Sequence, residues 1–82
     1  APSYEERAVL WRNNLPEGIQ LEASLSVEEL AKKFSITGSN IVNIIHYACL
    51  KTLANKQQEI QRQYILEGVK REYSKEGKTI NI

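Results

Sequence analysis

The chain has 82 residues, which is enough for one domain with a modest hydrophobic core. Apolar residues make up 41% of it and charged residues 26%, as in an ordinary water-soluble fold. The net charge of +1 gives no electrostatic reason to expect binding to nucleic acid or to an anionic membrane, and no apolar stretch approaches the ~18 residues of a membrane span.

The first helix is expected over about residues 3–14. Ser3 and Glu6 have the spacing of a capping box, in which two side chains satisfy backbone amides at a helix start. An apolar stripe at helical spacing follows, made of Tyr4, Ala8, Trp11 and Leu15. Pro16 ends this helix, because the residue before a proline disfavours helical geometry. Residues 17–25 are expected to form an irregular connection.

A second, short helix is expected over about residues 26–34. Ser26 and Glu29 repeat the capping-box spacing at its start. Its apolar face consists of Val27, Leu30, Ala31 and Phe34.

The third helix is expected over residues 38–54, with Thr37 as its cap, Gly38 in the first position and Asn40 in the third. Its apolar residues occur on more than one side, at Ile41, Val42, Ile44, Ile45, Ala48 and Cys49. Such broad apolarity indicates a central helix that its neighbours contact from several directions.

A polar loop over residues 55–59 precedes the last helix, expected over about residues 61–75. Gly68 inside this helix costs ~1 kcal/mol relative to Ala, which suggests close packing against a neighbouring helix. Gly77 is expected to stop the helix, and residues 77–82 to form a flexible tail.

Four helices with short connections predict a small all-α four-helix bundle over residues 1–76, and no strand-like alternation competes with this prediction. The bundle is chemically poor. All ten acidic residues are Glu, and there is a single His and a single Cys. No catalytic residue and no metal ligand can therefore be assigned.

Two isolated residues of the third helix are expected to be structural. His46 has no Asp and no second His to partner it, so we expect a packed or half-exposed histidine. Cys49, three residues later, is expected to be a small core residue rather than an activated thiol. A lone cysteine cannot form an internal disulfide, which indicates a reducing, cytoplasmic location.

Two nucleic-acid or nucleotide motifs are only superficially matched. Gly77-Lys78-Thr79 matches the end of a phosphate-binding loop, but Glu72 stands in place of its first glycine and a helix precedes it instead of a strand. Residues 27–45 have the outline of a helix-turn-helix. Yet residues 35–50 contain no Lys or Arg, so DNA binding remains the weaker alternative.

The order of short motifs resembles the C-terminal helical lid of AAA+ ATPases over nearly the whole chain. The motifs are the arginine-bearing helix ending in Leu-Pro (residues 7–16, RAVLWRNNLP), LAKKF at 30–34, TGSNI at 37–41, and the closing Lys-Arg-Glu with a later Lys and Gly at 70–77. Each motif is weak alone, and in this order and spacing they are fairly specific.

The resemblance implies an adenine contact at the start of the third helix. In that family the glycine and the small residue after it, here Gly38 and Ser39, lie against the adenine of ATP or ADP. Asn14 matches a polar position that often reaches the ribose. Thr37 and Asn40 match residues that cap the helix beside this site.

The resemblance also implies partners that this chain does not supply. ATP or ADP with Mg²⁺ would be held by the large nucleotide-binding subdomain of a longer parent, and neighbouring subunits of a homo-hexamer would complete the assembly. The chain has no Walker motif, so we expect it to hydrolyse nothing alone. In the parent it would couple ATP hydrolysis to subunit motion, as a rigid-body rotation.

The chain departs from the family pattern at two places, which bear on the subgroup of AAA+ ATPases that it resembles and on the charge beside the site. No second-sensor arginine stands near the start of the third helix, which indicates the AAA group in the narrow sense. Asn40 replaces a common Asp, which preserves capping but removes a charge. Besides the helix-turn-helix, a helical protein-interaction adaptor remains an alternative to the lid.

Overall fold

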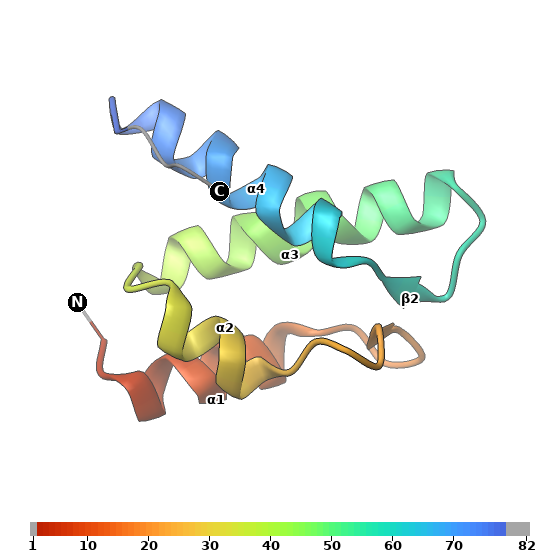
Figure 1. The fold of residues 1–82 in the computed structure, drawn as a ribbon, viewed down its shortest axis with the longest axis horizontal. Coiled ribbons are helices and arrows are strands. Elements are labelled where there is room, and N and C mark those ends of the chain that lie inside the picture. The colour runs from red at the N-terminus through yellow and green to blue at the C-terminus, as the bar shows by residue number, and fades with distance from the viewer. Residues whose placement is uncertain (1, 79–82) are drawn as a thin grey trace.

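The computed structural model describes residues 2–78 and contains four helices (Figure 1). They are α1 Tyr4–Asn14, α2 Val27–Lys33, α3 Gly38–Ala54 and α4 Arg62–Lys75, with two-residue strands β1 Gln20–Leu21 and β2 Glu59–Ile60. The expected all-α four-helix fold is confirmed. The helix bounds differ from the expected ones by one residue where a cap was counted as helix. Ala1 and tail residues 79–82 lie outside the described residues.

Local capping signals account for most helix ends. At α1 the Ser3 Oγ accepts from the Glu6 amide at 3.1 Å, and the Glu6 carboxylate accepts from the Ser3 amide at 2.8 Å. At α2 the Ser26 Oγ accepts from the Glu29 amide at 3.1 Å. The Glu29 carboxylate pairs with Arg62 instead, so the second expected capping box is only half formed.

The end of α4 is a glycine-dependent turn, as expected. Gly77 has φ +71°, and its amide donates to the Ser74 carbonyl at 3.1 Å. The Lys78 amide reaches back to the Tyr73 carbonyl at 2.8 Å. These two bonds form a Schellman motif, which satisfies carbonyls that the helix itself leaves free.

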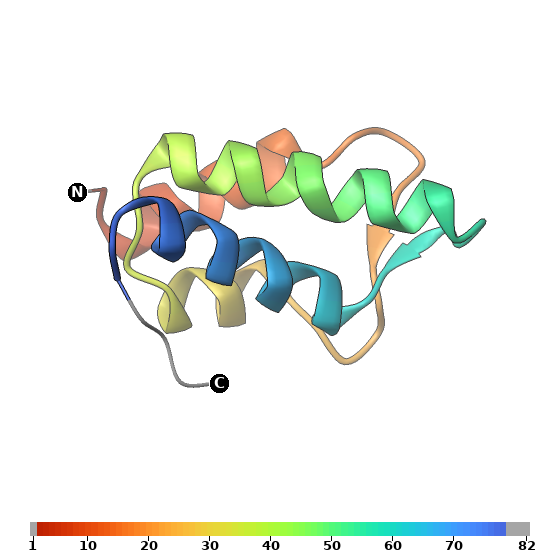
Figure 2. The same ribbon diagram turned by 90° about the horizontal axis from the view of Figure 1, so that it is seen from above.

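Helices α1 and α3 run in one direction, and α2 and α4 run in the opposite direction (Figures 1 and 2). Helix α3 packs against both α1 and α4, which confirms its expected central place. The largest fully buried side chains come from all four helices and from β2: Trp11, Leu30, Ile41, Ile44, Thr52, Ile60, Ile65 and Val69. Gly68 lies against Ile44, where an added Cβ would be only 3.1 Å from the Ile44 Cγ2. Its expected role in close packing is thereby confirmed.

A parallel strand pair joins the connection between α1 and α2, expected to be irregular, to the connection between α3 and α4, expected to be a polar loop. Gln20 pairs with Glu59 and Leu21 with Ile60, and the Glu22 amide extends the ladder to the Ile60 carbonyl at 3.0 Å. The sequence shows no strand-like alternation that would have predicted this pair. Two residues are too few to produce an alternating pattern, and the partners lie in different halves of the chain.

Arg7 occupies an unexpected place on the inner side of α1. Its side chain is buried, with Nε donating to the Ala31 carbonyl at 2.9 Å and Nη1 to the Pro2 carbonyl at 2.8 Å. Tyr4 at the start of the expected apolar stripe is instead 39% exposed. Within residues 2–78, no helix is both long and apolar enough to cross a membrane.

Candidate functional site

The first turn of α3 brings together the four expected residues from Thr37 to Asn40. Thr37 Oγ1 accepts from the Asn40 amide at 3.2 Å, and Asn40 Oδ1 accepts from the Thr37 amide at 3.2 Å, which confirms the predicted caps. The amides of Gly38 and Ser39 lie in the first turn, where a helix offers no internal acceptor. Gly38 is half-buried and Ser39 is exposed. Backbone at the positive end of α3 is therefore accessible.

The glycine at position 38 is not required by the fold. Its φ is not positive, whereas Gly18 and Gly77 have φ +84° and +71°. A Cβ added at Gly38 would meet its nearest neighbour, the Leu10 Cδ1, at 3.5 Å, which is ordinary van der Waals contact. Gly68, by contrast, has no room for a Cβ beside Ile44. Gly38 is the one glycine of the chain for which neither backbone conformation nor internal packing gives a reason.

Asn14 is the last residue of α1, and it lies beside α3 near Val42 and His46, beyond the first turn of that helix. Its side chain is exposed, and its Nδ2 donates to the Leu10 carbonyl of its own helix at 2.8 Å. It borders a hollow of about 170 Å³ that Val42 and His46 also line. Among residues 2–78, no hydrogen bond joins Asn14 to the first turn of α3. The structure places Asn14 beside α3 but does not bring it into the cluster around Gly38.

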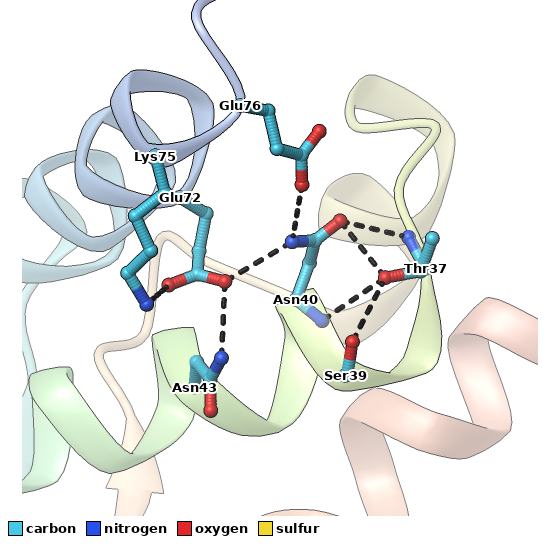
Figure 3. A network of polar contacts seen from close by, with 7 residues as sticks. All are labelled: Thr37, Ser39, Asn40, Asn43, Glu72, Lys75 and Glu76. Atoms are coloured by element: carbon cyan, nitrogen blue, oxygen red, sulfur yellow. Dashed lines mark hydrogen bonds and ion pairs between the residues drawn. The ribbon is translucent and has the colours of Figure 1, made fainter.

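Asn40 makes contacts that the sequence did not reveal (Figure 3). It is buried, and its Nδ2 donates to the Glu72 Oε1 at 3.0 Å and to the Glu76 Oε2 at 2.9 Å, both on α4 or its cap. The other end of its carboxamide accepts from the Thr37 amide and hydroxyl. The expectation that Asn40 acts as a cap is correct but incomplete. Its partners on α4 are 32 and 36 residues away, where spacing rules give no signal.

The buried carboxylate of Glu72 is held ionised by its neighbours. Burial alone would raise the pKa of Glu72, but hydrogen bonds from Lys75, Asn40 and Asn43 outweigh burial and lower its pKa below the ordinary value. At Glu76, hydrogen bonds from Asn40 and Lys78 lower the pKa. Two carboxylates at neighbouring positions of one helical face are thus kept charged by amides and ammonium groups.

His46 and Cys49 show no catalytic arrangement. His46 is exposed and not packed in the core, which leaves the half-exposed form of the expectation. Cys49 is buried, as expected, and burial raises the pKa of its thiol. A raised pKa is the opposite of what an activated thiolate requires.

The exposed residues of α3 include three large apolar side chains beside the polar Ser39, Asn43 and His46. Val42, Leu50 and Leu53 are 44%, 56% and 60% exposed, and the first basic residue of the helix is Lys51. A helix that reads DNA presents polar or basic side chains to base edges and phosphates. Because α3 has no Lys or Arg before Lys51, this surface gives no electrostatic support to the helix-turn-helix alternative.

No protein-family model matches the chain, and a search of curated proteins finds no match.

Proposed function

We propose that this chain is the C-terminal helical lid of an AAA+ ATPase of the AAA group in the narrow sense, contributing the adenine side of a nucleotide site. The observation that carries the proposal is Gly38. It is a glycine that the fold does not need, at an accessible helix start and followed by exposed Ser39. A flat purine resting on the backbone would supply the missing reason for a residue without a side chain.

The surroundings of Gly38 suit such a contact. Leu10 lies 3.5 Å from the position that a Gly38 Cβ would occupy, so an apolar side chain flanks the exposed backbone. The positive end of the α3 dipole favours the negatively charged side of a nucleotide. Asn14 lies one turn beyond Leu10 on α1, and in this proposal its amide would leave the Leu10 carbonyl to contact the ribose.

The chemistry of hydrolysis belongs elsewhere in this proposal. ATP or ADP with Mg²⁺ would be held by a large nucleotide-binding subdomain of the same parent, in a hexamer of the cytoplasm. This chain would bind the base, exclude water from that side, and move relative to the large subdomain when the nucleotide changes. The proposal requires a phosphate-binding loop elsewhere in the native polypeptide, and a native chain without one contradicts it.

A nitrogen–proton NMR titration of the chain with ADP tests the adenine contact. We expect weak, unsaturated shifts centred on Gly38 and Ser39, with no hydrolysis of ATP. Saturation below about 100 µM, a binding free energy near −5.5 kcal/mol, would contradict an incomplete site. An absence of any response at these two residues at millimolar ADP would contradict the contact itself.

Matched variants sharpen this titration. Ser39→Leu places bulk over the proposed purine position and should abolish the shifts at Gly38. Ala54→Leu adds similar bulk at the exposed far end of the same helix and should leave them unchanged. Equal effects of the two variants would show that the shifts do not report a local contact.

A helical protein-interaction adaptor is the second candidate, because Val42, Leu50 and Leu53 expose apolar surface along α3. It becomes the better explanation if Gly38 and Ser39 ignore ADP. Titration with duplex DNA, read by the same spectra, tests the helix-turn-helix alternative through its steep dependence on salt.

A further inference from the structure

The carboxamide of Asn40 joins two helix ends that are far apart in sequence. Its oxygen accepts from Thr37 at the start of α3, and its nitrogen donates to Glu72 and Glu76 at the end of α4 (Figure 3). The start of α3 and the end of α4 lie at the same end of the molecule (Figures 1 and 2). One planar group therefore connects the backbone around Gly38 to the last turn of α4.

The residue type at position 40 follows from this arrangement. Glu72 and Glu76 are four residues apart on one face of α4, and like charges at that spacing repel each other. An amide can donate one N–H to each carboxylate while its oxygen still caps α3. An aspartate would keep the cap but would place a third negative charge beside the other two. The carboxylate pair thus explains the asparagine that departs from the family pattern.

We propose that Asn40 is a positioning residue. It sets the orientation of the first turn of α3 according to whether Glu72 and Glu76 accept hydrogen bonds from its Nδ2. Where the first turn faces a nucleotide, as the proposed function has it, the end of α4 and the adenine contact are linked. The linkage is reciprocal. A contact that draws exposed Glu76 away releases the turn, and a purine on Gly38 tightens the bond to Glu76.

The proposal gives Asn40→Asp an effect opposite in sign to that of a simple helix cap. A negative charge in the first turn of α3 should favour the helix through its dipole. If repulsion by Glu72 and Glu76 dominates instead, hydrogen exchange of the Ile41 amide, which bonds to the Thr37 carbonyl at 3.1 Å, accelerates about fivefold. The Gly38 and Ser39 cross-peaks shift at the same time.

Glu76→Gln provides a gentler test, because Glu76 is exposed and the substitution keeps a hydrogen-bond acceptor. We expect it to shift the Gly38 and Ser39 cross-peaks, although residue 76 is 36 positions from Asn40. Asn40→Asp combined with Glu76→Lys restores one donor to the bridge, and should return the exchange rate toward the wild-type value. Glu17→Gln, an exposed change outside the bundle ends, is the control and should shift neither cross-peak.

Slower exchange in Asn40→Asp, or unmoved Gly38 and Ser39 cross-peaks in Glu76→Gln, would overturn the proposal. All these spectra are recorded without nucleotide. If the chain does not respond to ADP but the variants shift the Gly38 and Ser39 cross-peaks, only the proposed function is contradicted. If the chain binds ADP but the variants leave these cross-peaks unmoved, only the role of Asn40 is contradicted.

Discussion

At position 40 a single carboxamide side chain caps the start of α3 and also binds two carboxylates at the end of α4. The cap on α3 depends on residues three apart, a spacing that the sequence displays directly. The bonds to Glu72 and Glu76 depend on how α4 returns along α3, which no local pattern encodes. Buried Arg7 escaped prediction for the same reason, because its acceptor at Ala31 lies on another helix.

The lowered pKa values of Glu72 and Glu76 predict acid sensitivity. In the unfolded chain these groups have the ordinary glutamate pKa of about 4.3, so the folded state binds their protons less tightly. Their contribution to stability is complete above the ordinary value and is lost as the pH falls through the lower folded values. We expect the free energy of unfolding, measured in urea, to decrease between about pH 5 and pH 3.

Glu72→Gln isolates the buried part of this effect. It should lower the free energy of unfolding at neutral pH by about 2 kcal/mol, because hydrogen bonds to a charged group are lost. It should also leave a shallower pH profile, in which Glu6 and Glu29 still contribute through their own lowered pKa values. A variant profile as steep as that of the wild type would contradict the assignment.

At the scale of elements, the helices were predictable because their ends carry local signals. Ser3, Thr37 and Pro16 each fix a boundary within one residue. The strands were missed because β1 and β2 exist only through their pairing, and each alone is two extended residues. In the candidate site, the capped first turn of α3 was predictable from local spacing. The place of Asn14 relative to that turn depends on how α1 packs against α3, and was not predictable.

Two glycines in helices predict opposite responses to alanine. Gly68→Ala should lower the free energy of unfolding by about 1–3 kcal/mol, because the new methyl group would lie 3.1 Å from Ile44 Cγ2 and 3.3 Å from Ile44 Cα. Gly38→Ala should be neutral or should stabilise by up to about 1 kcal/mol, because its Cβ has room. Urea denaturation of both variants checks this. A large loss in Gly38→Ala would remove the argument that the fold does not need this glycine.

At the scale of the whole molecule, the core does not stop at the helices. Ile60 of β2 is fully buried, together with Trp11 of α1, Leu30 of α2 and Ile65 of α4. The strand pair is therefore continuous with the hydrophobic interior, and the two connections that carry it are part of the packed structure.

Ile60→Ala should accordingly destabilise the domain by about 3 kcal/mol, the usual cost of a cavity in a well-packed core. Leu53→Ala removes a similar side chain that is 60% exposed, and should change the free energy of unfolding by no more than ~0.5 kcal/mol. Thermal and urea unfolding of the pair measure the difference. Similar losses in both variants would mean that β2 is not anchored in the core.

The strand pair has a mechanical consequence. Helices α1 and α2 form one hairpin and α3 and α4 another, joined by the short turn at residues 34–37 at one end and strapped by β1 and β2 at the other (Figure 1). Glu22 strengthens the strap, since its carboxylate accepts from the Arg62 amide 40 residues away. The two hairpins can separate at this end only if the β1–β2 hydrogen bonds and the Glu22–Arg62 contact break. The two hairpins should therefore move as one rigid body, so that a displacement at one end of the domain is transmitted to the other end.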